Sequence, residues 1–258
     1  MNDSGIALQI GVLTIRWYGV LICAGMLIGI FLARNLAKKR GLNCDEVYNL
    51  ALVILPAAVI GARLYYVAFS WDVYVDNPIN ALKIWRGGLA IHGGFLAALI
   101  ATYIYLKIRK QTFLSWADVF VPSLALGQAI GRWGNYFNGE AYGRQTDLPW
   151  AIFVDGAYHH PTFLYESLWN AGVFVFLLWL FNKEKRSGTV FAFYLMCYSF
   201  GRFWIEGLRM DSLMLFDTIR VAQLVSIILF MCGAVLLWWL RTQTKQHDVS
   251  NKKKKKQQ

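Results

Sequence analysis

The sequence predicts an all-α integral membrane protein, a bundle of about seven transmembrane helices with a small outward-facing loop region. Three observations predict this fold. Hydrophobic residues make up 57% of the 258 residues, apolar runs of near-spanning length recur along the chain, and basic residues border them. A helix needs about 20 residues to cross a hydrocarbon core of ~30 Å. Helices are favoured over open strands there, because lipid offers no water to unpaired backbone groups.

Seven runs are predicted to span the membrane: Trp17–Leu36, Leu50–Phe69, Leu89–Leu106, Leu114–Ile130, Phe163–Phe181, Val190–Trp204 with a polar extension to Arg209, and Val221–Leu240. Together they form one polytopic membrane domain over residues 1–242, whose outer loop region is 131–161. Residues 243–258 are predicted to be a basic, disordered tail in the cytoplasm.

The basic residues predict the orientation of the bundle. If the N-terminus lies outside, 17 of the 26 lysines and arginines fall on inner segments, as the positive-inside rule requires. They are Arg34, Lys38, Lys39, Arg40, Lys107, Arg109, Lys110, Lys183, Lys185, Arg186, Arg241, Lys245 and Lys252 to Lys256. We therefore expect the N-terminus outside and the C-terminus in the cytoplasm. Despite the net charge of +11, we expect no nucleic-acid partner, because the basic residues border hydrophobic spans.

Each of the first three spans carries a polar feature near its outer end. Tyr18 opens the first span beside Trp17, where aromatic side chains usually anchor a helix at the interface. Arg63 lies about one turn inside the second span and is a candidate outward cation. His92 lies about one turn inside the third span, between two glycine pairs that allow close approach. It is a candidate proton acceptor, although a hydrogen bond to a neighbouring helix explains it equally well.

The fourth span runs into the segment Gly131–Gly143, GRWGNYFNGEAYG. The guanidinium of Arg132 offers a planar fork of donors suited to phosphate oxygens. Asn135, Asn138 and Glu140 add further polar groups, and the glycines let backbone N–H groups face an anion. A capped helix end with a glycine-rich turn explains any one of these residues but not the whole set.

The fifth span begins with HPTFLYE, in which Glu166 is a candidate buried acid. In the sixth span Tyr198, Arg202, Glu206 and Arg209 are spaced by four, four and three residues, which places them on one helical face. Arg202 lies roughly two turns below the outer surface, where polar groups normally face the bundle interior or a wet cavity. A self-neutralising pair with Glu206 is the simpler explanation, but it accounts for only one of the arginines.

These residues point to an anionic lipid. We expect Arg132 and Arg202, with Arg63 and Arg209 as further candidates, to converge near the outer leaflet. No metal-binding set, nucleophile elbow, phosphate-binding loop or dinucleotide fingerprint is present. We therefore expect no metal and no cofactor, and a nucleophile that arrives with a second substrate.

GRWGNYFNGEAYG resembles the signature of the bacterial prolipoprotein diacylglyceryl transferase family, G-R-x-G-N-F-x-N-x-E-x-x-G. The resemblance continues through IRWYG, HGG, HPTFLYE and the YxxxRFxxExxR pattern of the sixth span, in the order of the family, from about Gly11 to Leu240. Two positions depart from it. Tyr136 stands where the signature has phenylalanine, and Phe163 stands where many members have glutamine.

The resemblance implies an enzyme of the bacterial cytoplasmic membrane that moves the diacylglyceryl group of phosphatidylglycerol to the lipobox cysteine in the signal peptide of a prolipoprotein. It would release glycerol phosphate and leave a thioether, the first step of lipoprotein maturation. The catalytic residues would be Arg132, Arg202 and His92, with His92 as the candidate base. From the chemistry of the step we expect Arg202 to stabilise the leaving group and Arg132 to orient the head group. The alternative to a dedicated base is an arginine-rich field that lowers the pKa of the thiol. The substrate-binding residues would be Arg132, Asn135, Asn138, Glu140, Gly143, Tyr18, Tyr198, Glu206 and Arg209.

Two other classes compete with this interpretation. A transporter or flippase for an anionic lipid would also place arginines in a lateral cavity, but it would carry polar groups along a complete path through the membrane. Here the candidate residues crowd into the outer half. A seven-helix receptor is disfavoured because the inner loops are too short for an obvious docking surface.

Overall fold

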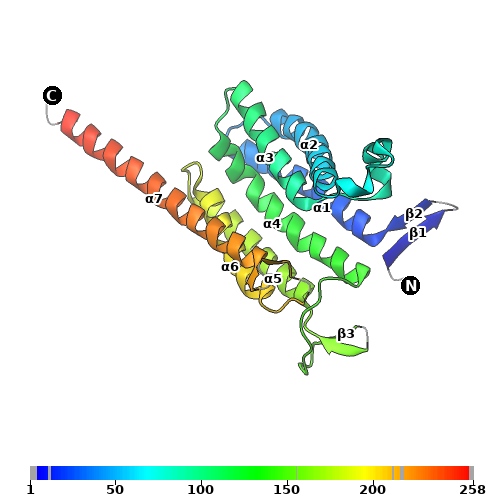
Figure 1. The fold of residues 1–258 in the computed structure, drawn as a ribbon. Helices are drawn as coiled ribbons and strands as arrows, with labels where there is room; N and C mark the ends of the chain where they lie inside the picture. The colour runs from blue at the N-terminus through cyan, green and yellow to red at the C-terminus, as the bar shows by residue number, and fades with distance from the viewer. Residues whose placement is uncertain (1–4, 11–12, 155, 211, 216–217, 256–258) are drawn as a thin grey trace. The chain divides into compact units, whose positions relative to one another are not determined.

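The computed structural model describes residues 5–10, 13–154, 156–210, 212–215 and 218–255 (Figure 1). Within these ranges the chain forms seven α-helices, as the sequence predicted. They are α1 (Trp17–Lys39), α2 (Asp45–Phe69), α3 (Ile91–Ile108), α4 (Phe113–Asn138), α5 (Thr162–Lys183), α6 (Thr189–Glu206) and α7 (Val221–Lys255). The all-α membrane fold is therefore confirmed.

Six of these helices are long and apolar enough to cross a membrane. The exception is α6, which has 18 residues and carries Arg202 and Glu206. Large apolar side chains such as Leu52, Ile104 and Trp238 are at least half exposed on α2, α3 and α7. Water-soluble surfaces rarely show so many, so these faces are suited to lipid.

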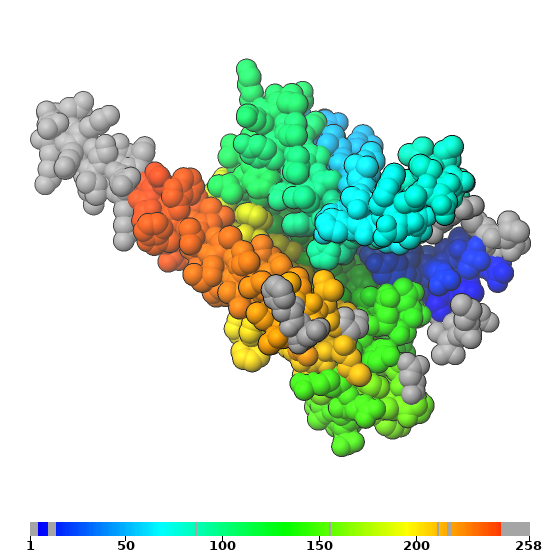
Figure 2. Space-filling model, viewed as in Figure 1, coloured from blue at the N-terminus to red at the C-terminus, as the bar shows by residue number. Residues whose placement is uncertain are grey.

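The connections carry short ordered elements that the sequence did not predict. Antiparallel ribbons are formed by β1 (Ile6–Ile10) with β2 (Leu13–Arg16), β3 (Ile152–Val154) with β4 (Ala157–His159), and β5 (Met214–Leu215) with β6 (Ile219–Arg220). Three 3₁₀ turns, η2 (Trp71–Val73), η3 (Pro78–Leu82) and η4 (Ile84–Arg86), follow α2. In the space-filling view the β3–β4 hairpin lies in a lobe that projects from the helices of its own unit (Figure 2).

The chain divides into two compact units. One comprises Met1–Ala33 and Ala117–Gln258, and the other comprises Arg34–Trp116. We refer to them as the first and second unit. The first holds most of α1 and α4 with α5, α6 and α7, and the second holds α2, α3 and the 3₁₀ turns.

In the second unit, α2 and α3 pack through glycines. A Cβ atom added at Gly94 would lie 3.1 Å from the backbone oxygen of Ala58, and one added at Gly61 or Gly93 would overlap the facing helix. Small residues allow two helix backbones to approach closely in a membrane. At the other end of this pair, the buried carboxylate of Glu46 accepts hydrogen bonds from Tyr105 and Arg109.

The expectation that Arg63 is an outward cation is wrong. Its side chain is buried on α2 and donates to the backbone oxygens of the following loop, at 2.9 Å for Asn80, 2.7 Å for Ala81, 2.6 Å for Gly87 and 2.9 Å for Gly88. The reason is that the loop after α2 turns several backbone carbonyl groups toward this helix, and buried carbonyl groups need hydrogen-bond donors. Five guanidinium donors on one side chain satisfy several of them at once.

In the first unit, α4 is the element to which the site is attached. Its Asp118 accepts hydrogen bonds of 2.8 Å from the backbone N–H groups of Gly188 and Phe191, and so holds the start of α6. α4 remains helical to Asn138, so the first eight residues of the predicted outer loop region 131–161 belong to the helix. The last two turns of α4 contain Gly134, and the ring of Tyr18 packs directly against the backbone at this glycine.

The C-terminal helix extends beyond the last predicted span. We expected disorder over 243–258, whereas the backbone of α7 is described as helical to Lys255. Residues 256–258, with the last lysine of the tail, lie outside the described residues. The location of this basic segment in the cytoplasm stays a prediction.

Candidate functional site

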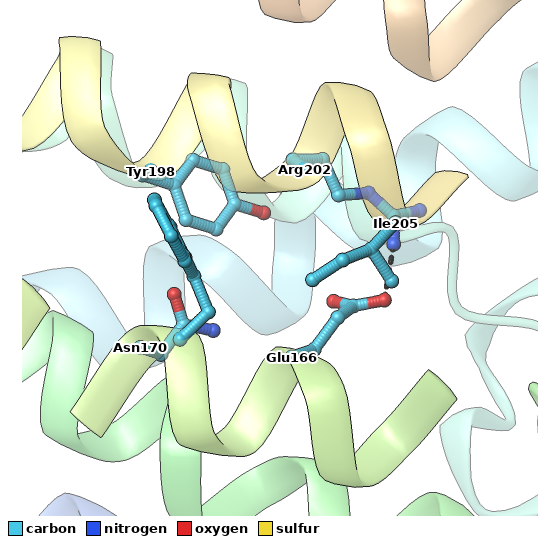
Figure 3. Close-up of a pocket in the computed structure, with 6 residues that line it drawn as sticks. Glu166, Asn170, Tyr198, Arg202 and Ile205 are labelled. Atoms are coloured by element: carbon cyan, nitrogen blue, oxygen red, sulfur yellow. Dashed lines mark hydrogen bonds and ion pairs between the residues drawn. The ribbon is translucent and has the colours of Figure 1, made fainter. Parts of the chain in front are cut away.

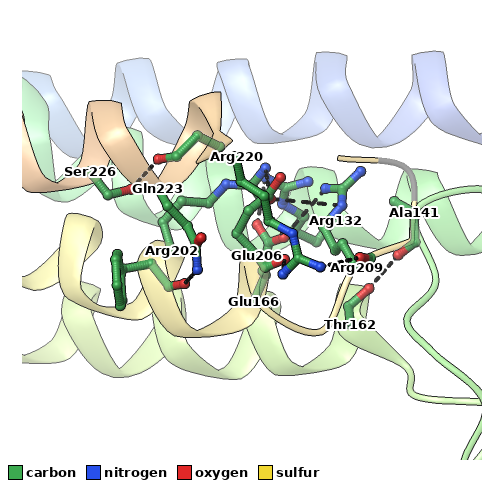
Figure 4. Close-up of polar contacts among 12 residues, drawn as sticks. Arg132, Ala141, Thr162, Glu166, Arg202, Glu206, Arg209, Arg220, Gln223 and Ser226 are labelled. Atoms are coloured by element: carbon green, nitrogen blue, oxygen red, sulfur yellow. Dashed lines mark hydrogen bonds and ion pairs between the residues drawn. The ribbon is translucent and has the colours of Figure 1, made fainter. Parts of the chain in front are cut away.

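The ends of α4, α5 and α6 meet in a cluster of arginines and glutamates, which we call the ion-pair cluster (Figure 4). It consists of Arg132, Glu166, Arg202, Glu206 and Arg209. Glu166 on α5 lies at its centre. One carboxylate oxygen lies 2.6 Å from Arg132 Nη2, and the other lies 2.5 Å from Arg202 Nη1 and 3.6 Å from Arg209 Nη1. The predicted convergence of arginines from distant segments is therefore present within the first unit.

The two carboxylates of the cluster are more deeply buried than its guanidiniums. The side chains of Glu166 and Glu206 are 4% and 3% exposed, whereas those of Arg132, Arg202 and Arg209 are 22%, 17% and 12% exposed. Three guanidiniums and two carboxylates leave one positive charge in excess. The cluster is thus suited to one additional anion at the side where the arginines are accessible.

The predicted pair of Arg202 with Glu206 is present, but it is only part of the cluster. Arg202 Nη2 lies 2.6 Å from Glu206 Oε2. α6 ends at Glu206, so Arg209 lies in the turn after the helix and not on its face as we expected. Its Nε still lies 4.0 Å from Glu206 Oε2.

Arg220, which the sequence analysis did not single out, holds the end of α6 in place. Its Nη1 donates a hydrogen bond of 2.9 Å to the backbone oxygen of Glu206, and its Nη2 donates one of 3.4 Å to that of Arg209. Gln223 donates to the oxygen of Phe203, 3.1 Å away. Carbonyl groups at a helix C-terminus need such donors, and a cation is favoured there.

The polar residues that follow Arg132 form a separate hydrogen-bonded group. The side-chain amides of Asn135 and Asn138 donate to the same oxygen of Glu140, at 3.0 and 3.1 Å. The backbone N–H of Glu140 also bonds the oxygen of Asn135. This group shapes the turn after α4, whereas the structure gives these three residues no ion pair with the cluster.

Gly143 links that turn to Arg209. Its N–H bonds the oxygen of His160, its own oxygen accepts from His159 Nδ1 at 2.8 Å, and it forms an isolated β-bridge with Arg209. A Cβ atom at this position would lie 2.8 Å from the Cβ of His160 and 2.9 Å from the Cγ2 of Thr162. Glycine is needed here because the side chains of His160 and Thr162 and the backbone oxygen of Leu208 leave no room for a side chain.

The two predicted site tyrosines lie on different helices of the first unit. Tyr18 is 41% exposed on α1, and its ring packs on Gly134, about half a turn beyond Arg132 on α4. Tyr198 lies one turn before Arg202 on α6, with its ring stacked on Tyr194 at 5.7 Å. Both tyrosines therefore flank residues of the ion-pair cluster.

A small pocket between α5 and α6 extends the cluster toward the middle of the helices. It is lined by Glu166, Trp169, Asn170, Tyr198, Arg202 and Ile205 and is too narrow to hold a water molecule. Figure 3 shows the Tyr198 hydroxyl directed toward Arg202. Asn170 is 2% exposed, and its side-chain oxygen has no hydrogen-bond partner in the part of the chain that is described.

His92 belongs to the second unit. It is the second residue of α3, it is exposed, and its ring centre lies 6.3 Å from that of Tyr65. The described residues contain no group of three or more His, Cys, Asp or Glu side chains that could hold a metal ion.

The sequence analysis missed the central position of Glu166. It recognised a candidate buried acid but assigned it no place in the site. The available signal was the position of Glu166 about one turn inside an apolar span, where an ionised carboxylate needs a partner. The same reasoning had been applied to Arg202 and would have linked the two.

Known proteins resemble this chain along most of its length. A family model described as prolipoprotein diacylglyceryl transferase matches residues 5–239. The phosphatidylglycerol–prolipoprotein diacylglyceryl transferase of Thermosynechococcus vestitus is 47% identical over 256 residues, which cover 95% of each chain. The protein of that name from Clostridium botulinum is 51% identical over 233 residues, which cover 86% of this chain and 91% of the relative.

Proposed function

Because the chain belongs to the prolipoprotein diacylglyceryl transferase family, we propose that the ion-pair cluster is its active site and binds the phosphodiester of phosphatidylglycerol. The enzyme is a membrane transferase that moves a diacylglyceryl group from phosphatidylglycerol to a prolipoprotein. The acceptor is the thiol of the lipobox cysteine. The observation that carries this assignment is the convergence of Arg132, Arg202 and Arg209 on the buried carboxylate of Glu166.

The reaction needs one bond to form and one to break. The cysteine sulfur bonds to the glyceryl carbon that carries the phosphate, while the bond between that carbon and the phosphate oxygen breaks. The electron pair stays on that oxygen, and the thiol proton passes to a base. The products are a thioether and glycerol phosphate.

The arginines supply what this step requires. Negative charge develops on the phosphate oxygens as the carbon–oxygen bond breaks, and fixed donors in a site that excludes water stabilise it. Arg202 is held between Glu166 and Glu206 and is therefore the best-oriented guanidinium for the leaving group. Arg132, the most accessible of the three, orients the phosphodiester. Asn135, Asn138, Glu140 and Gly143 shape the adjoining turn, and Tyr18 and Tyr198 flank the bound lipid.

His92 is assigned the role of base that takes the thiol proton. An unperturbed thiol has a pKa of about 8.5 and the thiolate is the nucleophile, so a base near neutral pH contributes ~10²–10⁴-fold. His92 is exposed, so its ring is accessible to a substrate.

Replacing His92 with glutamine is expected to lower kcat/KM by ~10²-fold or more. The rate is measured by transfer of labelled lipid to a lipobox peptide. A variant with the kcat/KM of the wild type would exclude His92 as the base. Tyr65→Phe, at the neighbouring ring, is the control and should keep the wild-type rate.

We further propose that the N-terminus and the site face outward from the bacterial cytoplasmic membrane. The support is that Lys183 lies in the last turn of α5, at the opposite end of that helix from Glu166, and that Lys38, Lys39 and Lys107 lie in the last turns of α1 and α3. A cysteine placed at Gly139 should react with an impermeant thiol reagent applied to intact spheroplasts, in a background without the native cysteines. One placed at Lys183 should react only after lysis, and the reverse pattern would overturn the orientation.

One reconstitution tests the function as a whole. The purified protein in proteoliposomes receives labelled phosphatidylglycerol and a peptide with a single lipobox cysteine. A thioether-linked diacylglyceryl peptide and released glycerol phosphate are expected. Redistribution of lipid between leaflets without thioether product would instead identify a transporter.

A further inference from the structure

We propose that Glu166 is a positioning residue that acts as an internal counter-anion, aligning the arginines for the lipid and weakening their hold on the glycerol phosphate product. This inference rests on the proposed function. It concerns a residue to which the mechanism above assigns no step, although three guanidiniums contact its carboxylate.

The geometry indicates that Glu166 joins the arginines to one another. Arg132, Arg202 and Arg209 come from α4, from α6 and from the turn after α6, and Glu166 on α5 contacts each of them. Glu206 contacts only Arg202 and Arg209, its neighbours in the chain. Glu166 is thus the one carboxylate of the cluster that connects Arg132 with Arg202 and Arg209.

The charges of the reaction explain why a counter-anion is useful. The phosphodiester of phosphatidylglycerol carries one negative charge. The five residues of the cluster carry one positive charge in excess, and Arg220 adds another beside the end of α6. Glycerol phosphate is a monoester with a charge of about −1.5 to −2 at pH 7. A cluster without Glu166 would carry an excess of two positive charges and would hold this product more tightly than the substrate.

The same carboxylate competes with the ligand for the guanidinium donors. Each N–H group that bonds Glu166 is directed toward the centre of the cluster, so the remaining N–H groups are fixed in direction. Removing the carboxylate charge frees the guanidiniums to follow any anion, which strengthens binding but loses the alignment that the transition state needs.

The test is Glu166→Gln, which keeps the size of the side chain and removes its charge. We expect kcat to fall by ~10²-fold, while the inhibition constant of added glycerol phosphate falls by roughly tenfold because an extra positive charge attracts the product at short range. A residue that only supports the fold would lower activity and protein yield without tightening product inhibition. An unchanged or weaker inhibition by glycerol phosphate would overturn the proposal.

Two matched variants sharpen this test. Glu206→Gln removes the same charge from the same cluster and should tighten product inhibition, but it should lower kcat less, because the link of Arg132 to α6 remains. An equal loss of kcat in both variants would contradict the proposal that Glu166, and not Glu206, aligns Arg132 with the other arginines. Glu46→Gln removes a buried carboxylate paired with Arg109 in the second unit and should leave the inhibition constant unchanged.

Glu166→Asp and the thioether assay of the wild-type protein separate this proposal from the proposed function. Aspartate restores the charge on a shorter side chain, so it should return product inhibition to the wild-type level with only part of kcat. If the wild-type protein forms no thioether at all, the proposed function fails. If the wild-type protein forms the thioether, but Glu166→Gln keeps the wild-type kcat and the wild-type inhibition by glycerol phosphate, only the positioning role fails.

Discussion

Arg202→Ala is expected to lower kcat/KM for diacylglyceryl transfer by at least ~10²–10³-fold. The guanidinium of Arg202 lies between the buried carboxylates of Glu166 and Glu206, which fix its direction. Its loss removes the donor that stabilises charge on the departing phosphate and leaves both carboxylates with one ion pair fewer. The measurement is the incorporation of labelled lipid into a lipobox peptide, with the amount of membrane-inserted protein determined in parallel.

Lysine should restore only a small part of this activity. An ammonium group is a point charge, whereas the two nitrogens of Arg202 contact Glu166 and Glu206 separately. Arg186→Ala is the matched control, since Arg186 lies in the connection between α5 and α6 and its side chain donates a long hydrogen bond of 3.4 Å to the backbone oxygen of Leu240. Wild-type rates in Arg202→Ala, or equal losses in both alanine variants, would contradict the role given to Arg202.

Gly143→Ala is expected to lower kcat/KM by ~10²-fold, because a displacement of about 1 Å in a site has effects of that size. The new methyl group would lie 3.0 Å from the backbone oxygen of Leu208 as well as against His160 and Thr162. The backbone around it must therefore shift. Gly143 forms a β-bridge with Arg209, so this shift would reach the cluster directly.

The same substitution at another glycine provides the control. Gly172 lies within α5, where an added Cβ atom meets nothing within 4 Å. Gly172→Ala should keep wild-type transfer and should stabilise the helix by roughly 0.5–1 kcal/mol. If Gly143→Ala were as active as Gly172→Ala, the turn would not position Arg209 as the structure indicates.

The sequence predicted the membrane fold because the properties that decide it are local. The length of an apolar run and the absence of water partners for its backbone are visible in any window of about 20 residues. The chemistry of the site was visible for a similar reason. Arg132 and Arg202 are costly to place in or beside a membrane span, and the order of the motifs around them matches one family from end to end.

The helix boundaries and the partners of the charged residues were harder to predict. The outer loop region was predicted to begin at residue 131, yet α4 continues past Gly134, on which the ring of Tyr18 packs, and ends at Asn138. Arg63 was grouped with the site arginines, but the carbonyl groups of its own loop occupy it. In both cases a contact with another part of the chain decided the outcome.

By itself, the sequence determined the class of protein, the approximate positions of its helices and the family whose chemistry it performs. Only the tertiary structure decided that Glu166 is the residue on which Arg132, Arg202 and Arg209 converge. The physical reason is that an ion pair depends on how far each helix is rotated and shifted against its neighbours. Those variables are set by packing across the bundle, whereas hydrophobicity and residue chemistry are properties of each segment alone.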